Sequence, residues 1–382
     1  MTAPEYAIVI PTIGRASLDR LLRRLGEGSG PPPSEVLVVN DRPGTPLRVQ
    51  VPSGLRDRIR LLDGPGRGPA AARNVGWRAA GAEWVVFLDD DVLPGDGWRA
   101  DLAHDLACDA AAVQGTVAVP LPADRPATDW ERQVGGLAGA AWISADIAYR
   151  RDVLVQVGGF DERFPRAYRE DTELAIRVRR AGHRLAVGTR VATHPVGPAN
   201  AWVSLRRQSG NADDALLRRL HGPRWRTLGD VPTGRRGVHA VVTGLAAAAM
   251  LAAVVRRRRL AAVAAAGWLA GTAEFAGRRI AAGPRTWSEI RAMVATSVFI
   301  PPAATAHWLW GWARHRGATP LTTPSPSSSD PWSLASTHAS SGPSVSKWKE
   351  RVAESNTDPD CPEGRYGAVR RGAVRPGRNT GR

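Results

Sequence analysis

The sequence predicts an α/β domain with a mainly parallel sheet over residues 1 to about 200. Short apolar runs alternate there with helical patterns, which is typical of such domains. The early runs are almost entirely apolar, as expected for strands covered on both faces. Polar residues follow several of these runs directly, at the strand ends where parallel sheets bind ligands. Strands are expected at Ala7–Ile10, Val36–Val39, Ile59–Leu62, Trp84–Leu88 and Ala112–Val119.

Helical patterns fill the gaps between these strands. One helix is expected at Ser17–Leu25, after the first strand, and another at Ala70–Ala80, before the fourth. Gly81 follows the second helix at the position where a helix C-terminal glycine is favoured. A further helix is expected at Thr172–Ala181 and ends before Gly182.

The composition divides the chain into three regions. Residues 1–233 hold the α/β domain with additional helices, and residues 318–382 form a Ser/Pro-rich and then Gly/Arg-rich tail that we expect to be disordered. Residues 234–317 combine long apolar runs with 12 basic and only 2 acidic residues. The formal net charge of +16 is therefore concentrated in one region, which argues against a chain that binds nucleic acid throughout.

Two further features restrict the class of protein. Cys108 and Cys361 are the only cysteines, so the sequence offers neither a disulfide framework nor a zinc cluster. The N-terminus lacks a basic segment followed by a long apolar run. We therefore expect the α/β domain to stay in the reducing cytoplasm.

The strongest chemical signal is the triplet Asp89-Asp90-Asp91, which directly follows the apolar run WVVFL. Three adjacent carboxylates at the end of a buried strand repel one another, and a cation would relieve this repulsion. Mg²⁺ and Mn²⁺ bind one or two carboxylates together with phosphate oxygens. The alternative interpretation is an acidic turn after the strand.

Other polar residues are expected at the same edge of the sheet. Asp41 follows the second strand, Pro11 and Thr12 end the first, and Arg15 lies just beyond. Because the carboxyl ends of parallel strands converge on one crevice, Asp41 and the triplet are expected to face one site. Asp41 could equally be a turn residue.

Three later segments add candidate site residues. The glycine-rich stretch at residues 64–77 fits no standard dinucleotide or phosphate loop, but it leads to Arg73 and Asn74 in an Ala-rich helix. Glu170 and Asp171 open the helix near residue 172, where an acidic residue can also serve as an N-cap. His194 follows a possible strand and could also be a surface histidine.

Together these segments resemble the family 2 glycosyltransferases, which are inverting, nucleotide-sugar-dependent enzymes with the GT-A fold. The resemblance covers about Tyr6 to Val196, and its landmarks occur in the family's order. They are VIPTIGR, VLVVNDRP, the Arg73-Asn74 pair, FLDDD, VGGFDERF and the Glu170-Asp171 pair.

The resemblance implies roles for these residues. Pro11, Thr12 and Asp41 would line the base and ribose pocket, and the donor site would also include Arg15, Arg73, Asn74, Asp89 and Asp90. Asp89 and Asp91 would hold a divalent metal, Mn²⁺ or Mg²⁺, with His194 as an additional ligand.

The resemblance also implies a reaction. Asp171 would be the catalytic base, with Glu170 beside it. The cation would neutralise charge on the leaving nucleoside diphosphate while the base takes the proton of an acceptor hydroxyl, which inverts the anomeric centre. The sequence departs from the family where Asn40 replaces the usual Asp and where Arg169 replaces a small residue.

Two other functions fit part of the sequence. A nucleotidyltransferase also uses carboxylate-bound metal, but the Glu170-Asp171 helix start favours glycosyl transfer. A basic nucleic-acid-binding protein is disfavoured because the arginines flank apolar runs and match no nucleic-acid motif. We therefore expect a nucleotide-sugar donor and a glycan or lipid-linked acceptor as partners, and no nucleic acid.

The apolar run Val238–Val255 is at the short end of what spans a bilayer, and Arg256–Arg259 separate it from a second run that ends at Ala276. If both runs spanned, the positive-inside rule applied to these arginines would place residues 1–233 outside, away from nucleotide sugars. We therefore expect helices that lie in or dip into the cytoplasmic leaflet, at the inner face of the plasma membrane. The acceptor would then be a lipid-linked or other cell-envelope glycan. The alternative is a soluble Ala-rich helical bundle packed on the α/β domain.

Overall fold

The computed structural model describes residues 4–321, so the disorder predicted for 318–382 lies almost wholly outside the described residues. An eight-stranded sheet forms the centre of the fold, with strand order β3-β2-β1-β4-β7-β6-β8-β5. Its strands are β1 (Tyr6–Thr12), β2 (Glu35–Asn40), β3 (Ile59–Asp63), β4 (Trp84–Leu88), β5 (Leu93–Pro94), β6 (Ala112–Ala118), β7 (Asp146–Arg150) and β8 (Leu185–Thr193). The five predicted strands are confirmed as β1, β2, β3, β4 and β6.

The sheet is mixed. β3, β2, β1 and β4 are parallel neighbours, whereas β7 runs antiparallel between β4 and β6. β8 pairs parallel with β6, and the short β5 pairs antiparallel with β8. The prediction of a mainly parallel α/β sheet is therefore confirmed, with one antiparallel strand inserted at its centre.

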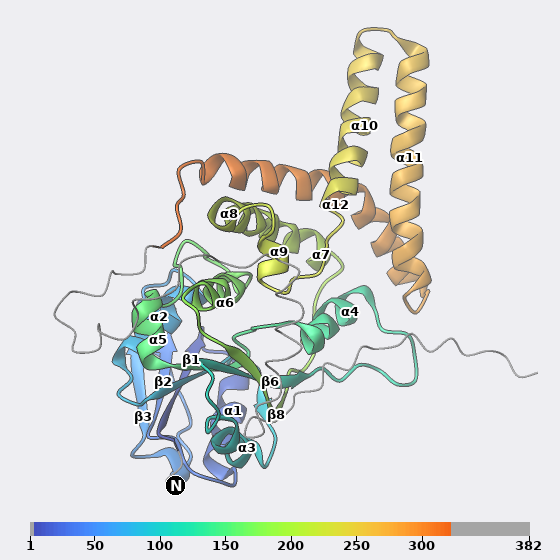
Figure 1. Cartoon of the computed structure of the whole chain (residues 1–382). Helices are drawn as coiled ribbons and strands as arrows, with labels where there is room; N and C mark the ends of the chain where they lie inside the picture. Colours follow the sequence, from blue (N-terminus) through green and yellow to red (C-terminus); the bar gives the residue numbers. More distant parts are fainter. Residues whose placement is uncertain (1–3, 322–382) are drawn as a thin grey trace, which may run out of the picture.

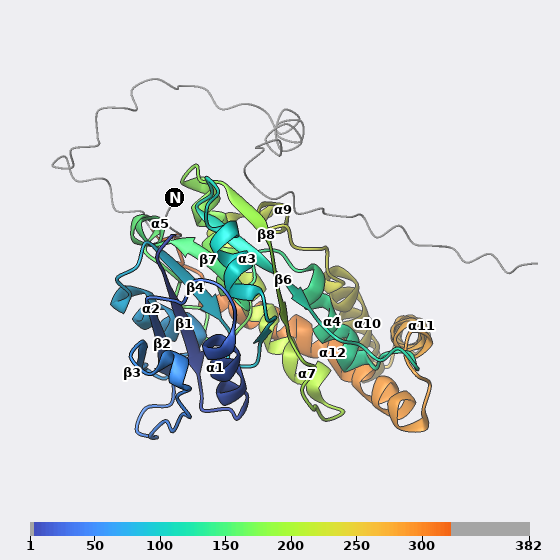
Figure 2. The same ribbon diagram turned by 90° about the horizontal axis from the view of Figure 1, so that it is seen from below.

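Helices cover both faces of the sheet, as the apolar strands require. In β1, Ile8 and Ile10 pack with α1 and α3, whereas Ala7 and Val9 pack with α2, α5 and α6. Figure 2 views the molecule from the side of α1 and α3. The helices of the α/β part are α1 (Ser17–Glu27), α2 (Pro69–Ala79), α3 (Trp98–Asp105), α4 (Asp129–Gly135), α5 (Arg151–Val157) and α6 (Glu170–Arg180). The three helices predicted in this part are α1, α2 and α6.

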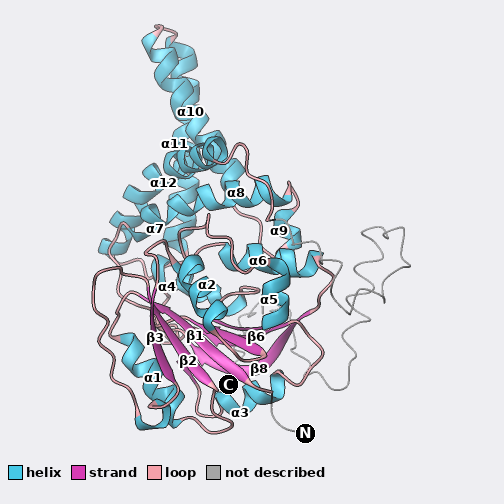
Figure 3. Cartoon of the chain, turned by 90° about the vertical axis from the view of Figure 1, so that its left-hand side faces the viewer, coloured by secondary structure: helices cyan, strands magenta, loops and turns pink. Residues whose placement is uncertain are grey.

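Further helices lie beyond α6, on the side away from the sheet (Figure 3). They are α7 (Val203–Arg206), α8 (Asn211–His221), α9 (Trp225–Leu228) and α12 (Trp287–Arg314). Phe164, Ile176 and Leu216 belong to a separate apolar cluster that joins α6 to α8. In turn, α12 packs on α8, where the Arg219 guanidinium lies 3.3 Å from the centre of the Trp312 ring.

Helices α10 (Arg236–Val254) and α11 (Arg258–Ala281) form an antiparallel hairpin that projects away from the rest of the molecule (Figure 1). By length and composition, both could cross a membrane, and little of either helix is buried. We call this segment, residues 236–281, the projecting hairpin. Its tip is the arginine run Arg256–Arg259.

A buried ion pair fixes the base of the projecting hairpin. Arg279 near the end of α11 donates from Nη2 to Asp129 Oδ2 at 2.8 Å, at the first residue of α4. The same guanidinium donates to Thr296 and Ser297 on α12. Because a buried charge is tolerated only when it is paired and hydrogen-bonded, this contact ties the hairpin to the α/β part at a defined place.

Candidate active site

The three consecutive aspartates after β4 have different environments. Asp90 is buried and accepts a 2.5 Å hydrogen bond from Thr12 Oγ1 at the end of the adjacent strand β1. Arg15 donates from Nη1 to Asp90 at 3.0 Å and to Asp91 at 2.8 Å. Burial raises the pKa of Asp90, and these two partners oppose that rise. Asp90 therefore joins the ends of β1 and β4, while its neighbours are more open.

Asp91 and His194 form the candidate cation site. Asp91 Oδ1 lies 3.6 Å from His194 Nε2, and both side chains are partly exposed. Carboxylate oxygen and imidazole nitrogen are suitable ligands for Mn²⁺, and this separation would let one ion contact both. Among residues 4–321, no group of three or more histidine, cysteine or acidic side chains could hold a metal ion alone. Diphosphate oxygens and water would have to complete the shell, which is how Mg²⁺ and Mn²⁺ usually bind beside phosphates.

Asp89 is linked to the other half of the site by Arg73. Arg73 on α2 is 1% exposed and donates from Nη2 to Asp89 Oδ1 at 2.7 Å and from Nη1 to Glu170 Oε1 at 2.8 Å. Helix α2 can bring this side chain so deep because Gly76 faces β1, where a Cβ atom would lie 2.3 Å from Val9 Cγ1. One guanidinium thus connects the end of β4 with the start of α6.

Glu170 is buried, and only one of its two carboxylate oxygens is hydrogen-bonded. Its Oε1 accepts from Arg73, whereas its buried Oε2 has no hydrogen-bond partner. Burial and the neighbouring Asp171 carboxylate raise the pKa of Glu170, against the opposing effect of Arg73. The Arg73–Glu170 contact is therefore sensitive to the charge that its surroundings carry.

Asp171 lies in the first turn of α6. Its Oδ1 accepts from the Thr172 amide at 2.7 Å, and its Oδ2 accepts a longer bond of 3.4 Å from the Ser144 amide. The N-cap of α6 is Arg169, so the alternative interpretation of Glu170 or Asp171 as the N-cap is wrong. Burial raises the pKa of Asp171, and a raised carboxyl pKa suits a general base that works near neutral pH.

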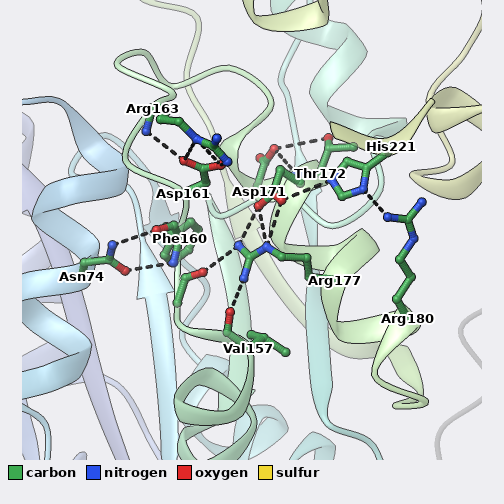
Figure 4. Close-up of polar contacts among 12 residues, drawn as sticks. Asn74, Val157, Phe160, Asp161, Arg163, Asp171, Thr172, Arg177, Arg180 and His221 are labelled. Carbon is green, nitrogen blue, oxygen red and sulfur yellow. Dashed lines mark hydrogen bonds and ion pairs between the residues drawn. The ribbon is translucent and has the colours of Figure 1, made fainter. Parts of the chain in front are cut away.

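A cluster of buried polar side chains holds α6 in place (Figure 4). Arg177 donates to Glu173 one turn earlier and to the carbonyl oxygens of Val157 and Gly159. His221 of α8 contacts Glu173 at 3.2 Å. These residues were not among those predicted from the sequence, although Glu173 and Arg177 have the four-residue spacing of a helical ion pair.

Asn74 fixes the turn that leads to α6. Its Nδ2 donates to the Phe160 carbonyl at 2.8 Å and its Oδ1 accepts from the Phe160 amide at 2.9 Å, as Figure 4 shows. Its Oδ1 also accepts from Trp77 Nε1. The donor-binding role predicted for Asn74 stays a prediction, because in this structure its amide is fully used by the fold.

The end of β2 organises the glycine-rich loop. Both carboxylate oxygens of Asp41 accept backbone hydrogen bonds at 2.8 Å, from Gly66 and from Gly68. Asn40 donates to the Thr45 carbonyl, which a carboxylate could not do. This is a physical reason for Asn where the family has Asp. Asp41 remains at the sheet edge together with Pro11, as predicted, and its contact with a nucleotide stays a prediction.

Arg169, the second departure from the family pattern, has an unusual backbone. Its φ of +78° is a left-handed conformation that a small residue adopts more easily. The side chain donates from Nε to Asp214 on α8 at 2.8 Å and stacks on Tyr168 at 4.4 Å. These contacts hold the residue before Glu170 against α8 and offset the backbone cost.

Comparisons with known proteins find similarity to glycosyltransferases. Residues 7–133 match the model of glycosyl transferase family 2. The pre-mycofactocin glycosyltransferase of Mycobacterium tuberculosis is 31% identical over 198 residues, which is 47% of this chain and 40% of that protein. The validoxylamine A glucosyltransferase of Streptomyces hygroscopicus subsp. limoneus is 37% identical over 97 residues, or 24% of this chain and 21% of that protein. The chain therefore spans less than half the length of these curated relatives.

One similar solved structure is the mannosyltransferase PcManGT from Pyrobaculum calidifontis in complex with GDP-Man and Mn²⁺. It is 21% identical, and the match covers 81% of this chain and 88% of that one with a TM-score of 0.44.

The sheet order and the helices on both faces agree with the GT-A architecture that the sequence predicted. The similarity to glycosyl transferase family 2 is confined to residues 7–133, which are about a third of the chain. Glu170, Asp171 and His194 lie beyond the matched residues.

Proposed function

We propose that the protein is an inverting glycosyltransferase that moves a sugar from a nucleoside-diphosphate donor to an acceptor hydroxyl. The observation that carries this proposal is the Arg73 bridge, with one nitrogen on Asp89 and the other on Glu170. It joins the acidic strand end, which suits a diphosphate and its cation, to the helix that presents Asp171. This arrangement supports the proposal, because it would hold a donor site and a general base in one rigid unit.

In the proposed reaction each residue has a limited task. A divalent ion at Asp91 and His194 would offset the negative charge of the diphosphate. Asp171 accepts the proton of the acceptor hydroxyl as that oxygen attacks the anomeric carbon from the side opposite the leaving group. Arg73 keeps Glu170 in place beside this base.

The role of Asp171 is tested by Asp171→Asn. The amide can still accept the Thr172 hydrogen bond but cannot take a proton, so turnover should fall at least about 100-fold while donor binding stays near that of the wild type. Asp57→Asn changes an exposed carboxylate that is distant in sequence from Asp171. It is the matched control and should leave turnover unchanged. Normal turnover of Asp171→Asn would show that the base lies elsewhere.

The cation site is tested by binding rather than by turnover. Asp91→Asn and His194→Ala should each weaken the Mn²⁺-dependent binding of UDP and GDP, measured by calorimetry. Chelator should reduce wild-type binding to the level of these variants. Equal binding by the wild type with and without chelator would contradict the proposed site.

The nucleotidyltransferase alternative makes a different by-product. Glycosyl transfer releases a nucleoside diphosphate, whereas nucleotidyl transfer releases inorganic pyrophosphate. Incubating the protein with a panel of nucleotide sugars, and separately with nucleoside triphosphates and sugar phosphates, separates the two. Pyrophosphate release by the second set alone would overturn the glycosyltransferase proposal.

We also propose that the protein works at the cytoplasmic face of the plasma membrane on a lipid-linked or other cell-envelope glycan. The projecting hairpin supports membrane association, because its apolar residues are exposed rather than packed on the α/β part. A soluble bundle packed on that part would bury them. Sedimentation of the full-length protein with anionic vesicles tests the association, and a protein that stays in the supernatant would contradict it.

A further inference from the structure

The projecting hairpin has apolar side chains on all sides. Val241, Leu251 and Val254 of α10 are 62%, 65% and 78% exposed, and Val263 and Leu269 of α11 are 71% and 57% exposed. Residues 237–255 contain no acidic or basic side chain except His239, and residues 260–273 contain none. A water-exposed surface of this size and composition is typical of a membrane contact.

The longer of these two runs matches the thickness of a bilayer, and the shorter one falls short of it. At 1.5 Å per residue, the 19 residues 237–255 extend about 28 Å and the 14 residues 260–273 about 21 Å. The hydrocarbon core of a bilayer is about 30 Å thick. The four arginines at the tip would reach the far headgroups by extending their side chains across the remaining distance.

Two shallower arrangements fit the residues less well. A hairpin lying flat on a leaflet needs one polar face, but the uncharged runs offer only Ala, Gly, Val, Leu and a few other mostly apolar side chains. A hairpin that dips to half the bilayer would leave Arg256–Arg259 at its centre, where arginine is most costly. Full crossing places these arginines in the far headgroup region.

The base of the hairpin is built like a membrane interface. Arg235 and Arg278 pair with Glu274 at this level, close to the Arg279–Asp129 contact. On α12, which passes the base of the hairpin in Figure 1, Trp287 and Trp310 are 70% and 51% exposed. Aromatic and basic side chains together are enriched at membrane surfaces.

The charges on both flanks set the orientation. The 20 residues before residue 237 and the 20 after residue 273 contain ten arginines, against four at the tip. When the arginines at both ends of the hairpin are counted, the positive-inside rule places the α/β part in the cytoplasm. The tip arginines alone would place the tip in the cytoplasm and the α/β part outside.

We infer that the projecting hairpin crosses the membrane twice, with Arg256–Arg259 in the outer headgroup region and both the α/β part and α12 on the cytoplasmic side. This inference rests on the membrane association proposed above and makes it specific. It requires no enzymatic activity, so its failure and that of the glycosyltransferase proposal can be told apart.

The test uses cysteine labelling of the full-length chain in intact cells. Arg257→Cys at the tip is compared with Ser288→Cys, an exposed residue at the base, both in a Cys361→Ser background. Cys108 is 2% exposed, so it should not react before unfolding. A membrane-impermeant maleimide should label the tip in intact cells and the base only after lysis. Labelling of the tip only after lysis, or of both sites before it, would overturn the inference.

A second pair of variants measures insertion itself. Ala247→Arg places a charge at the middle of α10 on an exposed position. It should leave a water-soluble hairpin intact but lower the equilibrium constant for membrane insertion about 100-fold. Ala281→Arg, at the base of α11, should have no effect. Carbonate extraction of membranes gives the inserted fraction, and equal retention of both variants would contradict the double crossing.

Discussion

Replacing Arg73 by methionine tests the bridge on which the proposed site depends. The side chain is 1% exposed, and its loss would leave Asp89 and the 1% exposed Glu170 without their counter-charge. Breaking a buried ion pair by removing one partner costs about 3–5 kcal/mol. For a protein of this size, this corresponds to a fall of the melting temperature by roughly 10 °C.

The double variant Arg73→Met/Glu170→Gln isolates the pairwise part of this loss. Glutamine replaces the unpaired, buried carboxylate of Glu170 with a neutral side chain. The double variant should therefore be more stable than Arg73→Met alone. Thermal unfolding of the purified full-length protein, followed by tryptophan fluorescence, gives the three melting temperatures against the wild type. The coupling should be at least about 1 kcal/mol, because directly contacting residues are not additive.

The same variant should respond to pH in a defined direction. Burial and Asp171 already raise the pKa of Glu170, and removing Arg73 removes the main opposing effect. A protonated Glu170 needs no guanidinium, so the loss in Arg73→Met should shrink as the pH falls. Two results together would refute the bridge as the link between the two halves of the site. The effects of Arg73→Met and Glu170→Gln on stability would be strictly additive, and the stability lost in Arg73→Met would not depend on pH.

Two further predictions concern packing and pH. Gly76→Ala should destabilise the protein by about 1–3 kcal/mol, because the new Cβ atom would lie 2.3 Å from Val9, whereas Gly277→Ala has open space and should be neutral or slightly stabilising in melting experiments. Burial raises the pKa of Asp213 to about 6 despite its ion pair with Arg166, so the folded state binds this proton more tightly than the unfolded state. Stability should therefore fall as the pH rises from about 4 to 6, by up to about 3 kcal/mol. Asp213→Asn should lack this slope, and an unchanged slope in denaturant titrations would contradict the assignment.

Strands with continuous apolar runs could be predicted from sequence almost to the residue. WVVFL coincides with β4, and the run at residues 36–39 needed only one residue at each end to become β2. Such strands carry their signal locally because both of their faces are covered. For the same reason, the position of the acidic triplet at a strand end could be predicted from the apolar run that precedes it.

The central antiparallel strand β7 could not be found in this way. Its sequence, DIAYR, begins and ends with charged residues. Asp146 is fully buried there because Arg190 and Trp98, distant in sequence, donate to its carboxylate. A local sequence pattern cannot indicate contacts between residues that are distant in sequence. The Arg73 bridge to Glu170 could not be predicted for the same reason.

The buried contact between Arg279 and Asp129 also sets an order of events during synthesis. The two residues are 150 positions apart, so the carboxylate of α4 emerges from the ribosome long before its counter-charge. At 5–20 residues per second, the interval is about 8–30 s. During that time the α/β part can form its sheet but cannot complete the packing around Asp129. Final assembly of the protein must therefore wait for the apolar hairpin that lies between the two residues, so that the nascent chain reaches its finished state only after its most hydrophobic segment has been made.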